Sequence, residues 1–489
     1  MRRRPSGQAS AAERIFFMAM EFERKITPKL ILSIIATGLT SFCGIIVETS
    51  MNVTFPTLMS EFGITTSTVQ WITTGYLLVL AVILPTSSFL NKRFKLRTMF
   101  IAAASLFIFG TLLCAWSPTF ALLLIGRLIQ GAGTGIAMPL MFNIVLQQVP
   151  YDKTGMMIGV ASILTTIGPA IGPTVGGLVV TYMGWRMIFV ILLPILVFAL
   201  LAGIFCIRQS SELSKPSFDI PGYIIIIICF VALVIGSSMA GDLGWSSPVV
   251  IGLIILCVIM AVIYFIYGKK KGDRAILNVA VFKYKGFNLC LIAYSVFMFI
   301  CLAMSFIIPN YTQLVNGHTA LQAGLAMMPG CLVMSLIGPF SGKIYDKIGG
   351  KIPFMVGGCF IIIAQILFNV FIRQATILTF ILIYLVFALG VGLSSSNSMT
   401  HGLKQIPENL SADGNAIYNT LQQLFAAIGT SITSSIVALA QAKTGETYQG
   451  TINGSANAYI MLLVLAVANF IIMLFVVADI RKKEKKNPA

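Results

Sequence analysis

Fourteen long apolar segments follow one another along this chain, and no other feature of the sequence restricts its fold so strongly. Each has about eighteen residues or more, the length that an α-helix needs to cross the hydrocarbon core of a bilayer. The segments lie at 30–57, 69–90, 98–116, 120–149, 155–182, 187–207, 220–240, 248–267, 287–311, 320–341, 353–372, 376–397, 412–440 and 457–478. Only 10% of the residues are charged, whereas soluble domains carry about 25%. We therefore predict an all-α membrane protein with 14 transmembrane helices.

The positions of the basic residues predict how these helices are oriented. Of 33 lysines and arginines, 29 lie in the two tails and in every second loop, whereas Arg186, Arg373 and Lys443 lie on the opposite side. Basic loops stay in the cytoplasm, so both termini are expected to be cytoplasmic. The net charge of +17 follows from this topology. The basic residues are scattered between lipid-length segments and do not form one surface, which argues against a nucleic-acid partner.

Two longer polar stretches, 208–219 and 268–286, bracket the seventh and eighth helices. A short basic turn follows the second helix at 88–97, and another follows the tenth helix at 342–351. Each is the second helix of its half, so the two turns form a weak internal repeat. Many secondary transporters consist of two repeated halves with the substrate site between them. We expect a cytoplasmic N-terminal tail at 1–28, a six-helix bundle at 29–207, two inserted transmembrane helices with cytoplasmic linkers at 208–285, a C-terminal six-helix bundle at 286–480 and a basic cytoplasmic tail at 481–489.

Residues 168–177 form a glycine and proline run inside the fifth apolar segment. Gly168, Gly172 and Gly176 recur at every fourth position and would form one ridge without side chains, which allows close helix packing in lipid. Pro169 and Pro173 remove backbone donors and bend the helix. The pattern predicts a bent, tightly packed helix, and ordinary helix packing is the alternative to a special role.

Glu48 is the one acid of sixteen that lies well inside an apolar segment, and Arg127 is the other clear intramembrane charge. Charges in hydrocarbon are unfavourable, so they usually face the bundle interior and mark ion or proton paths. Burial favours the neutral form of a carboxyl group, which suits a proton carrier. The alternatives for Glu48 are a structural acid satisfied by hydroxyls such as those of Thr49 or Ser50, or an acid at the outer rim of the membrane. The alternative for Arg127 is a side chain that extends to the membrane interface.

A substrate site in such a chain would be apolar with a few polar groups. The candidates are polar, aromatic or methionine side chains near the middle of a helix: Asn52, Gln70, Trp71, Tyr76, Met138, Met141, Asn143, Asn310, Tyr311, Gln313, Tyr418, Asn419, Gln422 and Gln423. Two histidines, His318 and His401, are too few and too far apart for a metal site. The sequence also has no phosphate-binding GxxxxGK[ST] motif. We therefore expect no metal and no cofactor.

Five motifs resemble those of the major facilitator superfamily, and in particular of its fourteen-helix branch of drug/proton antiporters. The loop 342–351 is similar to G-x-x-x-D-[RK]-x-G-x-[RK], 127–135 to the R-x-x-Q-G motif of helix four, and 168–177 to the antiporter motif G-P-x-x-G-P-x-x-G-G, with Gly184-Trp185-Arg186 after it. Segments 47–56 and 69–76 resemble the branch's motifs in helices one and two. Two departures stand out: Lys92 replaces the usual acid of the first basic loop, and Glu48 replaces the usual Asp.

The resemblance implies roles for these residues. Arg127 and Gln130 would take part in proton coupling together with Glu48. The gating and motif residues would be Gly168, Pro169, Gly172, Pro173, Gly176, Gly177, Gly342, Asp346, Lys347, Gly349 and Lys351. The glycine and proline run at 168–177 is expected to abut the C-terminal bundle and to help seal the cavity on one side.

The combined expectation is a proton-coupled antiporter that exports hydrophobic or amphiphilic small molecules by alternating access. Its partners would be a drug-like substrate, protons and the lipid bilayer, and the proton gradient would supply the energy. We expect a monomer in a bacterial inner membrane, and no enzyme activity. One alternative is a dedicated exporter of a single metabolite or lipid on the same fold. The other is a membrane-embedded enzyme or signalling module.

Overall fold

The computed structural model describes residues 26–209, 213, 217–407 and 410–486, and within them each of the fourteen predicted segments is helical. The N-terminal helices are α2 (Pro28–Phe62), α3 (Thr66–Val69), α4 (Trp71–Ile83), η1 (Leu84–Thr86), α5 (Ser87–Arg93), α6 (Leu96–Ala115), α7 (Phe120–Gln148), α8 (Tyr151–Met183) and α9 (Arg186–Cys206). The central elements are α10 (Ile220–Leu243), α11 (Pro248–Lys271), η2 (Gly272–Arg274) and η3 (Val279–Lys283). The C-terminal helices are α12 (Lys285–Leu314), α13 (Ala320–Ile348), α14 (Lys351–Phe371), η4 (Ile372–Gln374), α15 (Ile377–Lys404), α16 (Ser411–Thr444) and α17 (Thr447–Lys486).

Length and hydropathy make these helices suitable for crossing a membrane. Thirteen spans in the described chain are long and apolar enough, and α8 contributes a shorter apolar stretch over Ile167–Met183. The prediction of an all-α membrane fold is thus confirmed. Most of the predicted N-terminal tail, residues 1–25, lies outside the described residues.

Two predicted helices differ from the observed ones. The second span runs over Thr66–Arg93 but consists of four short helices in succession, with a 3-10 turn at Leu84–Thr86 that contains Pro85. A proline has no backbone N–H to donate and so interrupts regular α-helix. The last helix begins at Thr447, ten residues before its apolar segment, because nearly three polar turns extend the helix without adding hydropathy.

Local signals explain several of the helix ends. Thr319 forms a capping box with Gln322 at the start of α13, so that orphan backbone N–H groups of the first turn gain partners. Gly63 and Gly445 end α2 and α16 in the left-handed conformation, with φ of 63° and 70°. Glycine adopts this conformation without the steric penalty that a Cβ would bring.

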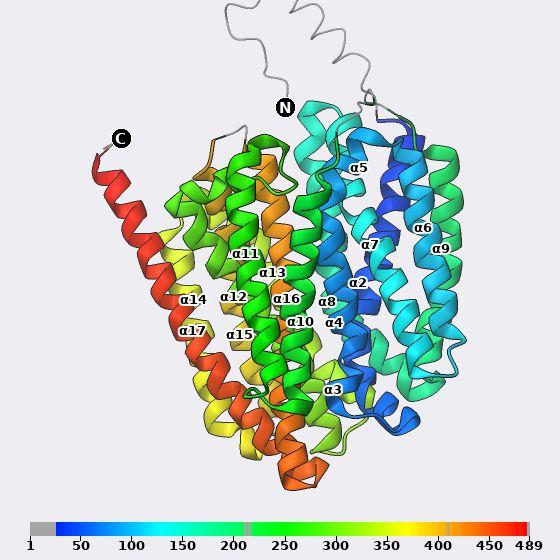
Figure 1. The fold of residues 1–489 in the computed structure, drawn as a ribbon, viewed down its shortest axis with the longest axis vertical. Coiled ribbons are helices and arrows are strands. Elements are labelled where there is room, and N and C mark those ends of the chain that lie inside the picture. The colour runs from blue at the N-terminus through cyan, green and yellow to red at the C-terminus, as the bar shows by residue number, and fades with distance from the viewer. Residues whose placement is uncertain (1–25, 210–212, 214–216, 408–409, 487–489) are drawn as a thin grey trace, which may run out of the picture.

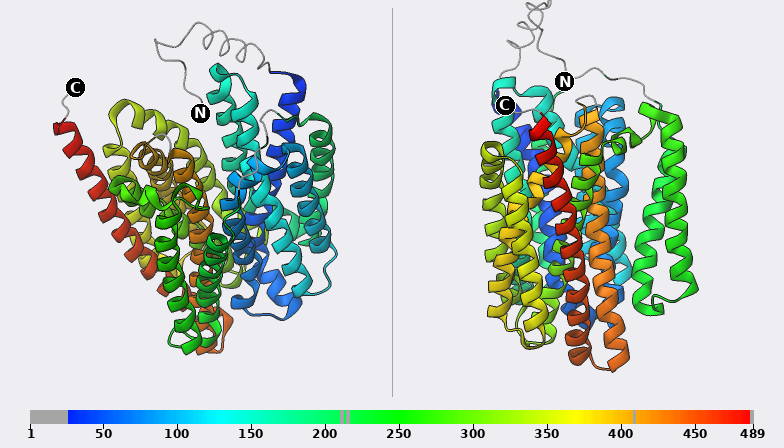
Figure 2. Two further views of the ribbon diagram at one scale, coloured as in Figure 1. Left: turned by 45° about the horizontal axis from the view of Figure 1, so that its top comes forward. Right: turned by 90° about the vertical axis from the view of Figure 1, so that its left-hand side faces the viewer.

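The long helices form two groups with a pair of helices beside their boundary (Figure 1). Helices α2 to α9 pack together on one side and α12 to α17 on the other. Helix α10 packs against α4 of the first group and α16 of the second. Helix α11 packs mainly on α10, is the least buried span, and lies at the outside of the molecule in the right-hand view of Figure 2.

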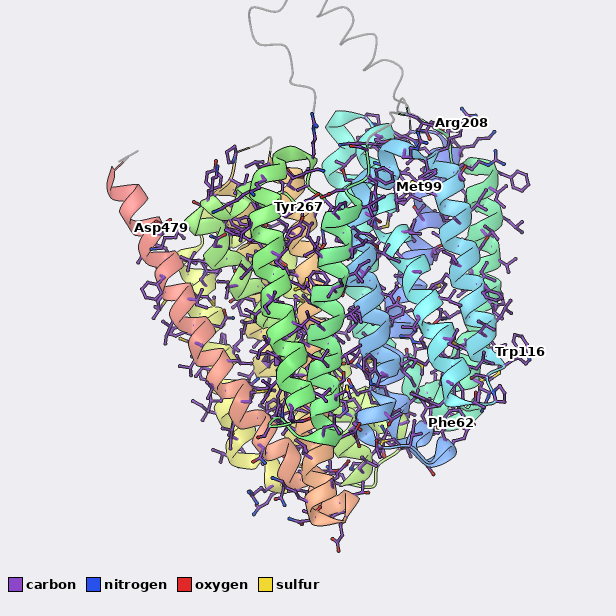
Figure 3. All side chains as sticks on the ribbon, in the orientation of Figure 1. Phe62, Met99, Trp116, Arg208, Tyr267 and Asp479 are labelled. Carbon is purple, nitrogen blue, oxygen red and sulfur yellow. The ribbon has the colours of Figure 1, made fainter. Side chains whose placement is uncertain are left out.

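Helix α2 begins and α17 ends at the same end of the molecule, which we call the terminal face (Figure 1). The opposite end, where α2 and α6 finish, is the distal face. Figure 3 shows Phe62 and Trp116 near the distal face and Met99 and Arg208 near the terminal face.

The two helix groups repeat one close packing contact. Helices α6 and α7 cross so tightly that a Cβ on Gly110 would lie 2.6 Å from the carbonyl oxygen of Gly126. Helices α14 and α15 cross in the same way, because a Cβ on Gly390 would lie 2.6 Å from the carbonyl oxygen of Gly357. These pairs are the third and fourth spans of their groups, so the weak repeat seen in the sequence has a counterpart in packing.

Candidate functional site

Arg127 lies two turns inside α7 and is held by three groups of the N-terminal half. Its Nε donates to the carbonyl oxygen of Ile72 at 3.2 Å, and its Nη1 donates to Oε1 of Gln130 at 2.9 Å. The guanidinium carbon lies 4.2 Å from the centre of the Tyr76 ring, a cation–π distance. Arg127 has 0% exposure, so its side chain does not extend to the membrane interface.

A chain of hydrogen bonds surrounds this arginine. Gln130 donates from Nε2 to Thr111 Oγ1 at 2.8 Å, which orients its carbonyl oxygen towards Arg127. The Tyr76 hydroxyl donates to Thr134 Oγ1 at 2.8 Å. Arg127 Nη2 is nevertheless buried without a hydrogen-bond partner among the described residues. The guanidinium thus keeps one unused donor, which is unfavourable in a buried site unless a further group approaches it.

Glu48 lies on α2 and is 8% exposed. Its carboxylate has no hydrogen bond and no ion pair within the described part of the chain, although it is close enough to Arg127 to interact electrostatically. The hydroxyl of Thr49 donates to Ile45 O at 3.0 Å, and that of Ser50 donates to Gly172 O at 2.6 Å. The neighbouring hydroxyls therefore do not satisfy Glu48, contrary to the structural alternative.

The glycine ridge of α8 packs against α2, on the residues beside Glu48. A Cβ on Gly168 would lie 2.7 Å from Ile45, one on Gly176 would lie 2.7 Å from Ser50, and one on Gly172 would overlap the Thr49 hydroxyl. The expected contact of the run 168–177 with the C-terminal bundle is therefore not made by these three glycines, which meet α2 instead. Residues four apart share one helix face, but the spacing does not say which neighbour that face meets.

A different face of the same run meets the C-terminal half. A Cβ on Gly177 would overlap the backbone of Ala320, and a Cβ on Gly324 would overlap the carbonyl of Pro173. Gly177 is one position beyond Gly176, which turns it by about 100° around the helix. Helix α8 is thus packed closely on α2 of its own half and on α13 of the other.

Polar contacts join the two halves near the distal face. Asn52 donates from Nδ2 to Ser305 Oγ at 3.0 Å and accepts from the Thr73 hydroxyl at 2.7 Å. Gln313 donates from Nε2 to Val53 O at 2.9 Å, and the Leu321 amide donates to Thr181 Oγ1 at 3.1 Å. These residues lie in the distal parts of α2, α4, α8, α12 and α13, so the halves are in contact on that side.

The substrate-site candidates lie in several different parts of the protein. Asn52 and Gln313 form hydrogen bonds between the two halves. Asn310, in the same part of α12, and Gln70, at the break between α3 and α4, each have a buried polar atom without a hydrogen-bond partner among the described residues, Oδ1 and Nε2 respectively. Trp71, Met138, Asn143, Asn419 and Gln422 are half-buried, and Met141 and Gln423 are buried. Tyr76 belongs to the arginine network, and Gln422 accepts from the Tyr294 hydroxyl at 2.8 Å.

Tyr311 and Tyr418 face other parts of the C-terminal half. The Tyr311 hydroxyl donates to Ile372 O at 2.6 Å and its ring contacts Phe380, while the Tyr418 ring contacts Phe287 and Tyr294. Sequence reasoning did not single out Ser305 or Thr73, although both bond to Asn52. Hydroxyl residues are common in these helices and usually bond to their own backbone, so no pattern distinguishes these two.

The motif loop at the terminal face is solvent-exposed. Asp346 lies 3.8 Å from Lys404 of α15, with side chains 73% and 57% exposed, and an exposed ion pair contributes little stability. Gly349 ends α13 with φ of 76°. Gly342 and Lys347 lie in the last turns of α13, and Lys351 begins α14. The ion-pair partner of Asp346 among the described residues thus belongs to its own half, and this contact does not link the two halves.

Two six-span groups of apolar helices that meet along a polar seam define a membrane transporter. The family model of the Major Facilitator Superfamily matches residues 37–430, and the chain belongs to this superfamily. It is 35% identical to the lincomycin resistance protein LmrB of Listeria monocytogenes, over 93% of this chain and 98% of the relative. It is also 35% identical to LmrB of Bacillus subtilis, over 88% and 89%.

The same fold occurs in solved structures. A POT family transporter in complex with 5-aminolevulinic acid superposes with a TM-score of 0.68, over 94% of this chain and 98% of that one. The sequence identity is 17%, so this likeness concerns the fold alone. The family and its transporter relatives identify the chain as a transporter rather than an enzyme.

The ridge of α8 leads to a testable prediction. We expect Gly172→Leu to displace Thr49, and with it Glu48, so that the reconstituted protein leaks protons when no substrate is present. The measurement is the decay of a pH gradient across proteoliposomes, followed with a pH-sensitive dye in the lumen. Gly252→Leu is the matched control, because a Cβ on Gly252 of α11 meets nothing within 4 Å. A Gly172→Leu protein that is proton-tight and exports normally would show that the ridge serves only for packing.

Proposed function

We propose that this protein is a proton-coupled antiporter that exports amphiphilic small molecules by alternating access. The observation that carries the proposal is Glu48: a carboxyl group inside the bundle, without a hydrogen-bond partner among the described residues, near an arginine that has an unused donor. An unpaired carboxylate in such a place is unfavourable, so binding a proton relieves the penalty.

The coupling follows from how Glu48 can respond to a proton. When Glu48 is charged it attracts the guanidinium of Arg127, and when it is neutral this attraction is lost. Any difference in the Glu48–Arg127 separation between two states of the bundle makes proton affinity differ between them. A substrate that prefers the opposite state is then exchanged for the proton, since each ligand shifts the same equilibrium.

The polar groups between the halves indicate the kind of substrate. Those that bridge α2 and α12 are amides and a hydroxyl, from Asn52, Gln313 and Ser305. Such groups bind neutral, zwitterionic or weakly charged molecules, with apolar side chains supplying most of the contact. The relatives named for lincomycin resistance support an antibiotic-like substrate of this class.

The topology belongs to the same proposal. The terminal face carries most of the basic residues, so it lies in the cytoplasm and the distal face outside. The bacterial relatives support a place in a bacterial inner membrane. Residues 29–207 and 286–480 act as the two moving halves of a monomer, with 208–285 as an inserted unit. The driving force is the proton gradient, without a cofactor.

Expression in a bacterium that lacks its own exporters tests this function. We expect lower susceptibility to lincomycin and to several amphiphilic dyes, together with dye efflux that a protonophore stops. Glu446→Gln is the matched control for changes at Glu48, because Glu446 is an exposed acid between α16 and α17. Resistance to a single compound would instead indicate a dedicated exporter, and no change with any compound would contradict export of this class.

A further inference from the structure

Helix α10, the first helix of the inserted pair, is bound firmly to the C-terminal half. Ser238 and Ser431 share a hydrogen bond of 2.7 Å between their hydroxyls, and Ser431 donates to Ser237 Oγ at 3.2 Å. Ser435 donates to the backbone oxygen of Ser237 at 2.7 Å. All these groups are buried, and such bonds between small residues hold helices together within a membrane.

The terminal end of the pair is bound to the same half through the linker after α11. Asp219 caps α10 and accepts from the Ile276 amide at 3.2 Å and from the Tyr267 hydroxyl. In the same linker, Asn278 donates from Nδ2 to Asp413 Oδ2 of α16 at 3.1 Å. Helix α10 is therefore tied to α16 towards its distal end, and the linker after α11 is tied to α16 at the terminal end, so we expect α10 to move with α16.

One hydrogen bond ties α10 to the N-terminal half among the described residues, and it lies at the distal face. The Ser67 hydroxyl of α3 donates to Asp242 Oδ1 of α10. A Cβ on Gly241 would lie 3.1 Å from Ser67 and 3.1 Å from Ser435, so α10 is packed between the two halves there. Thr66 adds a direct bond of 2.7 Å to Gln441 of α16.

At the terminal end, the polar links to the N-terminal half in the described residues lie in the linker that follows α9 and not on α10 itself: the Leu96 amide donates to Gln209 Oε1 at 2.8 Å, and Gln148 Nε2 donates to the Arg208 carbonyl oxygen at 2.9 Å. The segment before α10 contacts that half through the rings of Phe218 and Phe89, whose centres are 4.7 Å apart. An apolar ring contact of this kind allows small rotations. A rotation that separated α3 from α16 at the distal face would therefore break the Ser67–Asp242 bond while the Phe218 contact remained.

From this geometry we infer that the inserted helix α10 is a latch that holds the distal face closed, with Asp242 and Ser67 as its releasable contact. The inference rests on the alternating opening of the proposed function and assigns a role to the inserted pair within it. Hydrogen bonds to a carboxylate are stronger than neutral ones, so one such contact can bias an equilibrium between closed and open states.

Opening can be measured without any substrate. Ala323 of α13 is fully buried and packs with Val53 and Val180, close to the contact between the halves at the distal face. An Ala323→Cys reporter, in a background with the exposed Cys359 replaced by Ser, reacts with a membrane-impermeant maleimide only when that face opens. The measurement is the labelling rate of the purified protein in nanodiscs, where both faces are accessible.

We expect Asp242→Ala and Ser67→Ala each to raise the labelling rate about five-fold, the effect of losing one net hydrogen bond. The double variant should label no faster than either single one, because both changes remove the same contact. Asp242→Asn, which keeps an acceptor, should lie between these variants and the parent. Glu446→Ala, an exposed acid on the same face, is the control and should not change the rate.

Controls distinguish the loss of the latch contact from misfolding and from a loss of transport. Equal labelling of every variant after denaturation, together with a single peak in size-exclusion chromatography, identifies folded protein. A disulfide formed in Ser67→Cys/Asp242→Cys should slow labelling of the reporter, and reduction should restore it. Unchanged labelling in both single variants would overturn the latch. The readout needs neither substrate nor proton gradient, so a failure of the efflux test leaves this result interpretable.

Discussion

Replacing Glu48 by Gln is expected to abolish export against a gradient, by about a hundred-fold or more in initial rate, while the protein still folds. Gln has nearly the same shape and no titratable proton, and a neutral side chain at this place removes an unfavourable buried charge. We therefore expect the thermal stability of Glu48→Gln to equal or exceed that of the parent. Substrate binding measured at equilibrium should be detectable but weaker than in the parent, because the amide mimics the protonated carboxyl group and so favours the state that the substrate does not prefer.

The comparison with a second acid makes this result specific. Glu446→Gln removes an exposed carboxylate at the distal face and should export at the parent rate. Dye efflux in cells and melting of the purified protein give the two readouts. Parent-like efflux by Glu48→Gln would show that the proton, if one is used, binds elsewhere.

Replacing Arg127 by Leu is expected to have the second large effect, a loss of both stability and export. Leu would remove the guanidinium donor from the Ile72 carbonyl and would leave Gln130 Oε1 with only the weak Cys114 Sγ donor at 3.8 Å, and removing one partner of a buried charged network costs about 3–5 kcal/mol. Thermal unfolding of the purified protein measures this loss. The Tyr76 ring would also lose its cation–π contact.

Arg127→Lys distinguishes the effect of the positive charge from the effect of the guanidinium hydrogen-bond geometry. A lysine keeps the positive charge near Glu48 but cannot donate from a planar fork to two acceptors. We expect it to restore part of the stability and to shift the pH at which export is half-maximal, since the distance from the charge to Glu48 changes. A fully active, fully stable Arg127→Leu would contradict a role for this network.

The long helices could be predicted from the sequence because hydropathy and length are local properties. Each of the fourteen segments is helical in the described residues, whereas a hydropathy criterion missed the polar start of α17 at 447–456 and the breaks in the second span. Glu48 and Arg127 could be found for the same reason, because an ionisable residue within an apolar segment can be recognised from the sequence alone.

The partners of these residues could not be predicted, because they depend on how the helices are arranged in three dimensions. Glycine spacing showed that Gly168, Gly172 and Gly176 share a face, but not that this face meets α2. Ser305 lies far from Asn52 in sequence and has no distinguishing context, although the two form a bond between the halves. The latch contact of Ser67 with Asp242 is hidden for the same reason, since nothing in either segment points to the other.

Proton-coupled antiport can be measured as transport driven by a proton gradient across proteoliposomes. The protein is reconstituted with an acidic lumen and a neutral exterior, and a substrate found in the efflux assay is added outside. We predict substrate uptake coupled to alkalinisation of the lumen, both of which stop with a protonophore and are absent in Glu48→Gln. Uptake that is the same with and without the pH gradient, or that Glu48→Gln carries out as well as the parent, would contradict the account.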